Sequence, residues 1–321
     1  MTCIICLGEN EITDENPLTD EHIVPEFIGG TLVEKNVCKT CNSNLGGGFE
    51  GRLASNFYFK LARQVFDIKG KQPHAPNAFN GVYDHDSLGK VRVSNGKVAV
   101  FPEVQVEQNG SGFSISLKID KSEQPQAAKI LRKKLERHFK SQGVNLSSEQ
   151  LSLMVSNFFE NANITSNLTE KPQIAGSFVW NINDHALLHL KVAYELLVHH
   201  FGSSYLNDPV ATPIRLCLKE QVVKSEVSFT NQIDVPGFKT LIDDKNHWVY
   251  IVRNFCVVSI FGSVSSTVFT DKNSEFFDPI GTIYKFDVEG GQYSKSSFYE
   301  YLNSLTNASR GTVNAWRFQS H

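Results

Sequence analysis

Apolar residues recur at helical spacing in several stretches of the chain, and this periodicity predicts most of its helices. In residues 49–66, the side chains of Leu53, Phe57, Leu61 and Val65 fall on one helical face. Further helices are predicted at residues 124–141, 147–161, 184–201 and 295–306. A serine begins the second of these and a glycine follows the third, as capping residues do.

Alternating apolar and polar residues predict short strands between residues 81 and 119. The stretches KVRVSNGKVAVF and GFSISLKI alternate in this way, and SNGK between two alternating runs is typical of a hairpin turn. Another strand is predicted at residues 175–182, and the last third of the chain consists mostly of predicted strands. Because strands and helices follow one another in mixed order, we expect an α+β fold.

Residues 67–79 interrupt this regular pattern. They contain Gly70, Pro73 and Pro76, which favour turns over helix or strand. We therefore predict a linker at residues 67–79, between an N-terminal module of residues 1–66 and a larger α+β domain of residues 80–321. No internal repeat is visible in the sequence.

The composition is that of a globular protein. The chain has 321 residues, of which 40% are hydrophobic, enough to bury a core. Its longest apolar stretch, residues 248–261, is interrupted by Arg253 and Asn254, so we predict no membrane span. The first ten residues lack the cationic start and apolar run of a secretion signal, and we expect a cytoplasmic protein.

Charge is distributed unevenly along the chain. The net charge of −3 argues against nonspecific binding to nucleic acid. Residues 1–51 hold two lysines against nine acidic residues, whereas the remaining residues have an excess of four positive charges. If the protein binds a polyanion, we expect the C-terminal part to supply most of the contact.

Four of the six cysteines are clustered near the N-terminus. They form two CxxC pairs separated by 31 residues, Cys3 with Cys6 and Cys38 with Cys41. In a reducing compartment, such pairs predict a zinc site in preference to disulfides, because their thiolates can share one tetrahedral ion. Cys217 and Cys256 stand alone in apolar surroundings, so we predict buried thiols there.

The segment between the two pairs contains an acid and a histidine side by side. Taken in order, CIIC, EHIVPEFIGG and CKTCNSNLGG resemble the HNH endonuclease family, in particular its branch with a zinc-stabilised ββα-metal fold. The resemblance covers about residues 1–60. Without it, this region would be interpreted as a treble-clef-like zinc module with His22 on a surface loop.

The resemblance implies a role for each of three residues. His22 matches the general base, because an imidazole can accept a proton from water near neutral pH. Glu21 and Asn42 match the ligands of a catalytic divalent ion, and their oxygen donors favour Mg²⁺ or Mn²⁺. The four cysteines would then hold a separate structural Zn²⁺. Cleavage in this family leaves a 5′-phosphate and a 3′-hydroxyl.

Two positions depart from the commoner family pattern. Val33 stands where an asparagine usually orients the base, and the nearest asparagine is Asn36. We expect that a backbone carbonyl could fix the imidazole instead. Many relatives have histidine in place of Asn42, and the triple glycine that follows should end the helix carrying this residue. Asn44 and Glu50 are alternative ligands, although Asn44 would point about 200° away from Asn42 on a helix.

Basic residues follow one face of the predicted helix at 124–141. Between Lys118 and Lys140 there are eight basic and three acidic residues. The candidate nucleic-acid contacts on this face are Lys129, Arg132, Lys133, Arg137 and Lys140. A solvated helix face is the alternative interpretation, but beside an acidic nuclease module this surface is the best candidate to contact phosphates.

The histidines of the long helix at 184–201 are weaker candidates for a functional role. His185 and His189 have the spacing of a metal-binding pair but lack the glutamate of a metalloprotease helix, so we predict no second metal there. His199 and His200 lie near the helix end, where positive charge is favourable.

These observations predict a divalent-metal-dependent HNH endonuclease that cuts DNA. By analogy with similar bacterial proteins, we expect a role in antiviral defence or restriction, with the C-terminal domain selecting or sensing the target. Double-strand cleavage would require two sites, and hence a homodimer. The alternatives are a noncatalytic zinc module that binds nucleic acid or protein, and a nuclease that acts on RNA or awaits an activating ligand.

Overall fold

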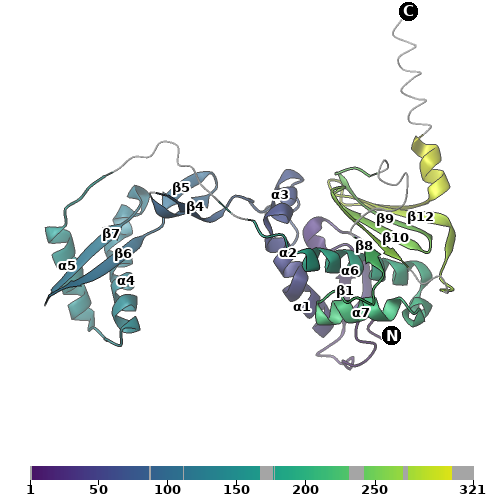
Figure 1. The fold of residues 1–321 in the computed structure, drawn as a ribbon, viewed down its shortest axis with the longest axis horizontal. Coiled ribbons are helices and arrows are strands. Elements are labelled where there is room, and N and C mark those ends of the chain that lie inside the picture. The colour runs from purple at the N-terminus through teal and green to yellow at the C-terminus, as the bar shows by residue number, and fades with distance from the viewer. Residues whose placement is uncertain are drawn as a thin grey trace, which may run out of the picture. The chain divides into compact units, whose positions relative to one another are not determined.

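The computed structural model describes residues 2–86, 88–110, 112–166, 176, 178–230, 242–269 and 274–305. Its residues form two compact units (Figure 1). The first unit combines the chain up to Ala78 with the chain from Val179 onward, and the second unit is Phe79–Phe178. The mixture of helices and strands, with a four-cysteine cluster near the N-terminus, confirms the predicted α+β class.

The N-terminal part of the first unit has a strand–strand–helix order. Its antiparallel strands are β1 (Leu18–His22) and β2 (Val33–Cys38), and a short 3₁₀ turn, η1 (Glu26–Ile28), lies between them. The helical segments that follow are α1 (Lys39–Leu45), η2 (Gly46–Glu50), α2 (Gly51–Ser55) and α3 (Phe57–Val65). As predicted, α1 ends before the triple glycine, although the chain stays helical through η2 and is kinked at Gly48.

The helix predicted at residues 49–66 is broken near its middle. Asn56 leaves helical geometry, with φ −67° and ψ 143°, and its side chain accepts a hydrogen bond from the Tyr58 amide. Asparagine is a favoured N-cap because its side chain satisfies a free N–H of the first turn. Apolar periodicity therefore located the helical region and the buried Leu53, but it missed the break between α2 and α3. Within α3 the buried apolar residue is Phe59, whereas Val65 is 67% exposed.

The C-terminal part of the first unit is a six-stranded antiparallel sheet, with helix α6 (Ile182–Phe201) on one face and the helical residues 298–305 against the other. The sheet order is β13-β12-β9-β10-β11-β8. These strands are β8 (Phe229–Thr230), β9 (Asn246–Arg253), β10 (Phe255–Ile260), β11 (Val264–Phe269), β12 (Asp278–Asp287) and β13 (Tyr293–Ser297). Helix α6 contacts β10 and β11, and α7 (Ala211–Glu220) lies beside α6, joined to it by η4 (Ser203–Asn207).

Alternate residues of β9 face opposite sides of this sheet. Val249 and Ile251 belong to the same apolar cluster as α6, whereas Trp248 and Tyr250 pack with Tyr301 on the other side. Residues 298–305 are helical, which agrees with the helix predicted at 295–306 except that β13 occupies its first residues. Residue 306 lies outside the described chain.

One hydrophobic core runs through the first unit. Ile23, Phe49 and Leu53 of the N-terminal part lie in the same buried cluster as Leu190 of α6 and Val258 of β10. Hydrophobic burial is the main favourable term in folding. The N-terminal part therefore shares its core with elements that lie more than 120 residues away in the sequence.

The second unit has its own small core. It contains a three-stranded sheet of β3 (Gly81–His85), β4 (Gly89–Ser94) and β5 (Lys97–Val100), and a pair formed by β6 (Glu103–Asn109) and β7 (Gly112–Lys118). Its helical segments are η3 (Lys121–Gln126), α4 (Ala127–Ser141) and α5 (Ser148–Asn161). Leu131, Leu135, Phe139 and Leu151 form its buried centre. The predicted strands, the SNGK hairpin and both helices are confirmed.

Two predictions differ from the structure or are left open by it. The strand predicted at 175–182 is wrong for residues 178–181, which are not in a strand; Asn181 instead caps α6, which begins at Ile182. The remainder of that range includes residues outside the described chain. Residues 80–321, predicted as one domain, are distributed over both compact units, and the division into functional domains stays a prediction. Among the described residues, no helix is long and apolar enough to cross a membrane.

Candidate functional site

The four N-terminal cysteines converge on one point. Cys3, Cys6, Cys38 and Cys41 are all buried, and their sulfur atoms lie within 4.8 Å of one another. A tetrahedral zinc ion binds sulfur at about 2.3 Å, which places its sulfur ligands about 3.8 Å apart. Two of the sulfurs, those of Cys6 and Cys38, are 4.0 Å apart. The donor set and its spacing therefore fit a closed zinc site.

Hydrogen bonds to these sulfurs favour a thiolate at Cys3 in particular. The Cys38 amide donates to Cys3 Sγ over 3.3 Å, and the Asn10 side chain donates to Cys41 Sγ over 3.5 Å. A hydrogen bond from the Cys41 thiol lowers the pKa of Cys3 to about 4. Because the thiolate is the form that binds metal, these donors favour a metal ion.

The pairing of β1 with β2 positions the acid–histidine pair. Glu21 lies opposite Glu34 and His22 opposite Val33, and the ladder is irregular between Thr19 and Glu21. Successive side chains of a strand point to opposite faces. Accordingly, Glu21 is 5% exposed and points into the protein, whereas the His22 side chain is 30% exposed.

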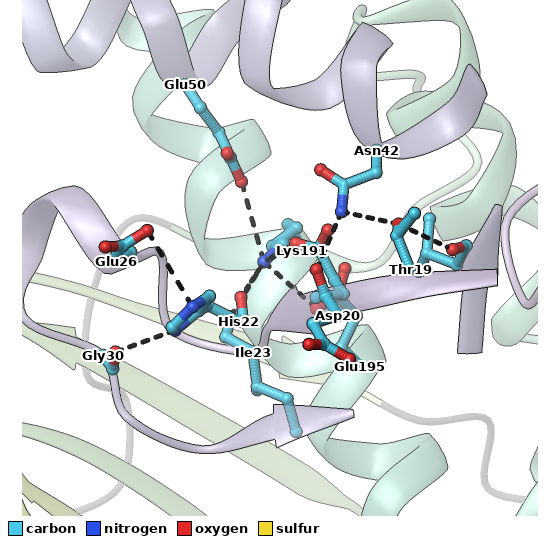
Figure 2. Close-up of polar contacts among 12 residues, drawn as sticks. Thr19, Asp20, His22, Ile23, Glu26, Gly30, Asn42, Glu50, Lys191 and Glu195 are labelled. Atoms are coloured by element: carbon cyan, nitrogen blue, oxygen red, sulfur yellow. Dashed lines mark hydrogen bonds and ion pairs between the residues drawn. The ribbon is translucent and has the colours of Figure 1, made fainter. Parts of the chain in front are cut away.

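A backbone carbonyl orients the His22 ring. Nδ1 lies 3.0 Å from the carbonyl oxygen of Gly30, so a proton on Nδ1 is donated to that oxygen and Nε2 carries the lone pair (Figure 2). Nε2 is 3.9 Å from a carboxylate oxygen of Glu26. Val33 lies opposite His22 across the ladder and has no polar side-chain group, and the Oδ1 atom of Asn36 has no hydrogen-bond partner among the described residues. The predicted backbone substitute for the missing asparagine is therefore present.

The glycine pair explains how this carbonyl reaches the ring. Gly29 has φ 92°, a left-handed conformation that glycine adopts without strain. A Cβ on Gly30 would lie 1.7 Å from the carbonyl oxygen of Val24. Only glycine fits this close approach, and the turn after Pro25 then returns to the start of β2 beside His22.

Asn42 belongs to helix α1, and its side chain is hydrogen-bonded to strand β1. Its Nδ2 donates to Thr19 Oγ1 and to the Asp20 carbonyl, both over 3.0 Å (Figure 2). These two bonds use the amide nitrogen, so the amide oxygen is the atom able to coordinate a cation. The position follows directly from Cys41, because the first turn of α1 begins inside the second cysteine pair.

Glu21 is held by a buried lysine from helix α6. Lys191 Nζ lies 2.7 Å from Glu21, 3.1 Å from Glu195 and 3.6 Å from Glu50. Figure 2 shows the same ammonium against the backbone carbonyls of His22 and Ile23. Burial alone would lower the pKa of Lys191, but the three carboxylates outweigh it and raise this pKa, so the lysine is charged.

The three predicted site residues line one open pocket. Its volume is about 290 Å³, and Glu21, His22, Asn42 and Glu50 all contribute to its wall. Burial raises the pKa of Glu50, which reaches the pocket just after the kink at Gly48. Asn44, the other alternative ligand, is not part of this wall. The sequence-predicted residues are thus brought together around a space that can admit water and a phosphate.

Sequence reasoning missed two groups at this site, the Gly30 carbonyl and Lys191. A backbone atom leaves no signal in residue type. Lys191 did leave one, because it stands in the apolar run LLHLKVAYELL with Glu195 four residues later. Residues Asp184–Val198 of α6 are all buried, so this lysine had to be paired inside the protein.

The basic residues of α4 lie in the second unit, as predicted, opposite its buried face. Lys129, Lys133, Arg137 and Lys140 are exposed, and Arg132 donates to the Ser148 and Ser152 hydroxyls of α5. A depression of about 410 Å³ beside α4 is lined by Arg92, Phe101, Lys133, Lys134 and Arg137, among others. Positive charge therefore surrounds a concave surface.

The histidines of α6 are structural. His185 stacks between Trp180 and Phe59, and His189 bonds the Ser266 hydroxyl. Burial lowers the pKa of His185 to about 4 and that of His189 to about 3, so both are neutral. Among the described residues, the four-cysteine cluster is the only group of three or more His, Cys, Asp and Glu side chains placed to hold one metal ion.

Two other predictions concern residues near these elements. Cys217 and Cys256 are buried thiols, as expected. His199 pairs with Glu34 over 2.6 Å, and His200 contacts Tyr284 and Asp278. The two histidines thus join the end of α6 to β2 and β12 through side chains.

Comparison with known proteins identifies the family of the N-terminal part. Residues 3–58 match the HNH endonuclease family. The chain therefore contains an HNH endonuclease domain with a four-cysteine site of the zinc type. Neither the search of curated proteins nor the search of solved structures found a match.

Proposed function

We propose that the protein is a divalent-metal-dependent endonuclease that hydrolyses phosphodiester bonds in DNA. One observation carries this proposal: Glu21, His22 and Asn42 line a single pocket within a domain that matches the HNH endonuclease family. Phosphodiester hydrolysis needs an activated water, neutralisation of charge at the phosphate and assistance to the leaving oxygen. The pocket contains groups suited to each need.

His22 acts as the general base. The hydrogen bond from Nδ1 to the Gly30 carbonyl leaves Nε2 as the atom that accepts a proton from water. The ring is partly exposed and lies on the pocket wall, so water reaches Nε2 without a conformational change. Glu26, 3.9 Å from Nε2, stabilises the imidazolium that forms.

Glu21 and Asn42 would hold the catalytic ion. A carboxylate and an amide oxygen are hard donors that suit Mg²⁺ or Mn²⁺, and Glu50 offers a further carboxylate to the same pocket. Such an ion, when bound, supplies Lewis-acid stabilisation of the phosphate and the leaving oxygen. The Thr19 and Asp20 contacts of the Asn42 nitrogen keep its oxygen turned toward the ion.

The four cysteines would hold a structural zinc ion. Their closed, buried arrangement provides four sulfur ligands and no open position for water or substrate. The ion would join the first cysteine pair to the start of α1, which carries Asn42. Zinc would thus fix one ligand of the catalytic ion relative to β1.

The basic face of α4 would contact the phosphates of the nucleic acid. Lys129, Arg132, Lys133, Arg137 and Lys140 supply positive charge that the acidic nuclease domain lacks. By analogy, this part of the protein selects or senses foreign or modified DNA in bacterial defence, and the protein acts in the cytoplasm. A homodimer would allow both strands to be cut.

The experiment that tests this function is a cleavage assay on a panel of substrates. Zinc-loaded protein is incubated with supercoiled plasmid, base-modified phage DNA, single-stranded DNA and RNA, with and without added Mg²⁺ or Mn²⁺. Omitting the ion is preferable to a chelator, which would also extract zinc. We expect ion-dependent cleavage of DNA.

The other results would favour the alternatives. Cleavage of RNA alone would show that the substrate is RNA and not DNA. Absence of cleavage with every substrate would favour a noncatalytic zinc-binding module, or a nuclease that needs an activating ligand.

A further inference from the structure

Lys191 is the most deeply buried charge in the described part of the first unit, and it belongs to the C-terminal part of the chain. Its side chain is 0% exposed, in the middle of the fully buried stretch of α6. Burying an ammonium is costly unless it is paired and hydrogen-bonded. An apolar side chain at this position would fold at lower cost, so the lysine requires an explanation beyond packing.

The partners of Lys191 are concentrated on the catalytic strand. Its ammonium contacts the Glu21 carboxylate, the His22 carbonyl and the Ile23 carbonyl, which belong to three consecutive residues. An ammonium has three N–H donors, and these acceptors can use all of them, while Glu195 is a further ion-pair partner at 3.1 Å. Lys191 thereby fixes both the side chain of the proposed metal ligand and the backbone of the proposed base.

The charges around Lys191 do not balance. Glu21, Glu50 and Glu195 place three carboxylates against one ammonium, and among the described residues Lys191 is the basic ion-pair partner of all three. With all three ionised, the formal charge of this cluster is −2. A divalent cation in the pocket beside Glu21 and Glu50 would offset this excess of negative charge, which Lys191 alone does not.

From this geometry we infer that Lys191 is a positioning residue of the nuclease site, holding Glu21 and the backbone of His22 and Ile23 in the arrangement that binds the catalytic ion. The inference rests on the proposed function. It also makes α6, about 130 residues beyond the segment that matches the HNH family, an integral part of the active site. Glu195, one turn along the same helix, supports the ammonium from behind.

Replacing Lys191 by methionine tests this role, because loss of its charge and loss of its positioning would change the affinity for Mn²⁺ in opposite directions. Removal of a positive charge would by itself strengthen the binding of a cation nearby. Loss of positioning would weaken it, because partners of metal ligands typically contribute about 10–100-fold to metal affinity or activity. A weaker affinity for Mn²⁺ in Lys191→Met is therefore the signature of positioning.

The measurement is a titration of zinc-loaded protein with Mn²⁺, followed by the electron paramagnetic resonance signal of the free ion, with zinc content and thermal unfolding recorded for each variant. We expect Lys191→Met to bind Mn²⁺ about 10–100-fold more weakly. Glu195→Gln leaves Lys191 in place and preserves the size of the side chain at position 195. We expect this variant to bind Mn²⁺ more weakly than the wild type, but by a smaller factor than Lys191→Met. Lys224→Met removes a lysine from a surface pair with Glu220 and serves as the matched control, with unchanged affinity.

The outcomes separate this inference from the proposed function. Unchanged or tighter Mn²⁺ binding by folded Lys191→Met would overturn the positioning role. The proposed function would still stand if His22→Ala abolished cleavage in parallel assays. If Lys191→Met does not fold, an unchanged affinity in Glu195→Gln overturns the positioning role in its place. Absence of Mn²⁺ binding by the wild-type protein would overturn both.

Discussion

At the scale of single residues, the site depends on a carbonyl that only glycine can deliver. Gly30 places its carbonyl 3.0 Å from Nδ1 of His22 and lies against the backbone of Val24. This contact replaces the side-chain amide that usually orients the base in the family. A change of residue type at position 30 therefore acts on the geometry of the base without touching it directly.

Substitution of Gly30 by alanine should damage the fold as well as the site. The added Cβ would overlap the Val24 carbonyl oxygen, and overpacking of this kind costs about 1–3 kcal/mol or more. Gly47→Ala is the matched control, because a Cβ there meets nothing within 4 Å and its φ is not positive. We expect a lower free energy of unfolding in urea for Gly30→Ala alone. Equal stability of the two variants would contradict this reading of the turn.

The sequence predicted the site residues that depend on local order. Glu21 and His22 are neighbours, and Asn42 follows a cysteine whose spacing marks the second zinc pair. The structure places all three on one pocket, although their chemical roles stay predictions. The Gly30 carbonyl could be anticipated only as a general substitute, since a backbone atom is positioned by the turn and not by residue type.

At the scale of elements, helix α6 makes the protein sensitive to acid. His189 is fully buried and neutral, and burial lowers its pKa to about 3, whereas an exposed histidine titrates near 6.5. Below about pH 6.5 the unfolded chain binds a proton that the folded chain does not, so the contribution of this residue to stability is lost as pH falls toward 3.

Comparison of the wild type with His189→Gln isolates this effect, because glutamine does not titrate. Between pH 7 and pH 5, we expect the wild type to lose about 2 kcal/mol more of its free energy of unfolding than the variant. Urea unfolding of both proteins at the two pH values measures the difference. Parallel losses in the two proteins would mean that His189 is protonated in the folded state.

Element boundaries show where apolar periodicity is insufficient. It located the helical residues of 49–66 and the long helix α6. It did not mark the buried face of α3, where Phe59 is buried and Val65 is exposed. It missed the end of α2 and the start of α6, where Asn56 and Asn181 bond free amides at helix N-termini. The strand predicted before α6 failed for the same reason, since capping at Asn181 competes with strand formation.

At the scale of the whole molecule, the compact unit of residues 79–178 is inserted into a unit whose N-terminal and C-terminal parts share one core. The two chain segments that lead into and out of this inserted unit are both hydrogen-bonded to the same short helix, α3, or to its N-cap. The Ala78 amide bonds the Gln64 side chain over 2.8 Å, and the Val179 carbonyl accepts from the side chain of its N-cap, Asn56, over 3.0 Å. Eight residues of helix span about 12 Å, so the two anchoring positions are close.

Replacing residues 79–178 by a flexible linker of about eight Gly and Ser residues should therefore preserve the first unit. We expect the shortened protein to keep one zinc ion per chain and to unfold cooperatively, and to lose affinity for DNA because the basic face of α4 is removed. Zinc analysis, calorimetry and a binding titration measure these properties.

A fragment of residues 1–66 is the informative comparison. It lacks α6 and β10, which share its core, and we expect it to be unfolded or much less stable. Stable folding of this fragment, or loss of zinc by the shortened protein, would contradict the shared core. The sequence could not reveal this sharing, because contacts between Ile23 and α6 join positions far apart in the chain.

The most direct test of the central proposal is a single-turnover cleavage assay of His22→Ala against the wild type, both zinc-loaded and supplied with Mn²⁺. His22 lies outside the cysteine cluster, so the variant should keep its zinc and its fold. We expect the wild type to cut DNA and the variant to lose at least about 100-fold in rate, the usual contribution of a general base. Equal cleavage by the two proteins would show that the chemistry does not take place at His22.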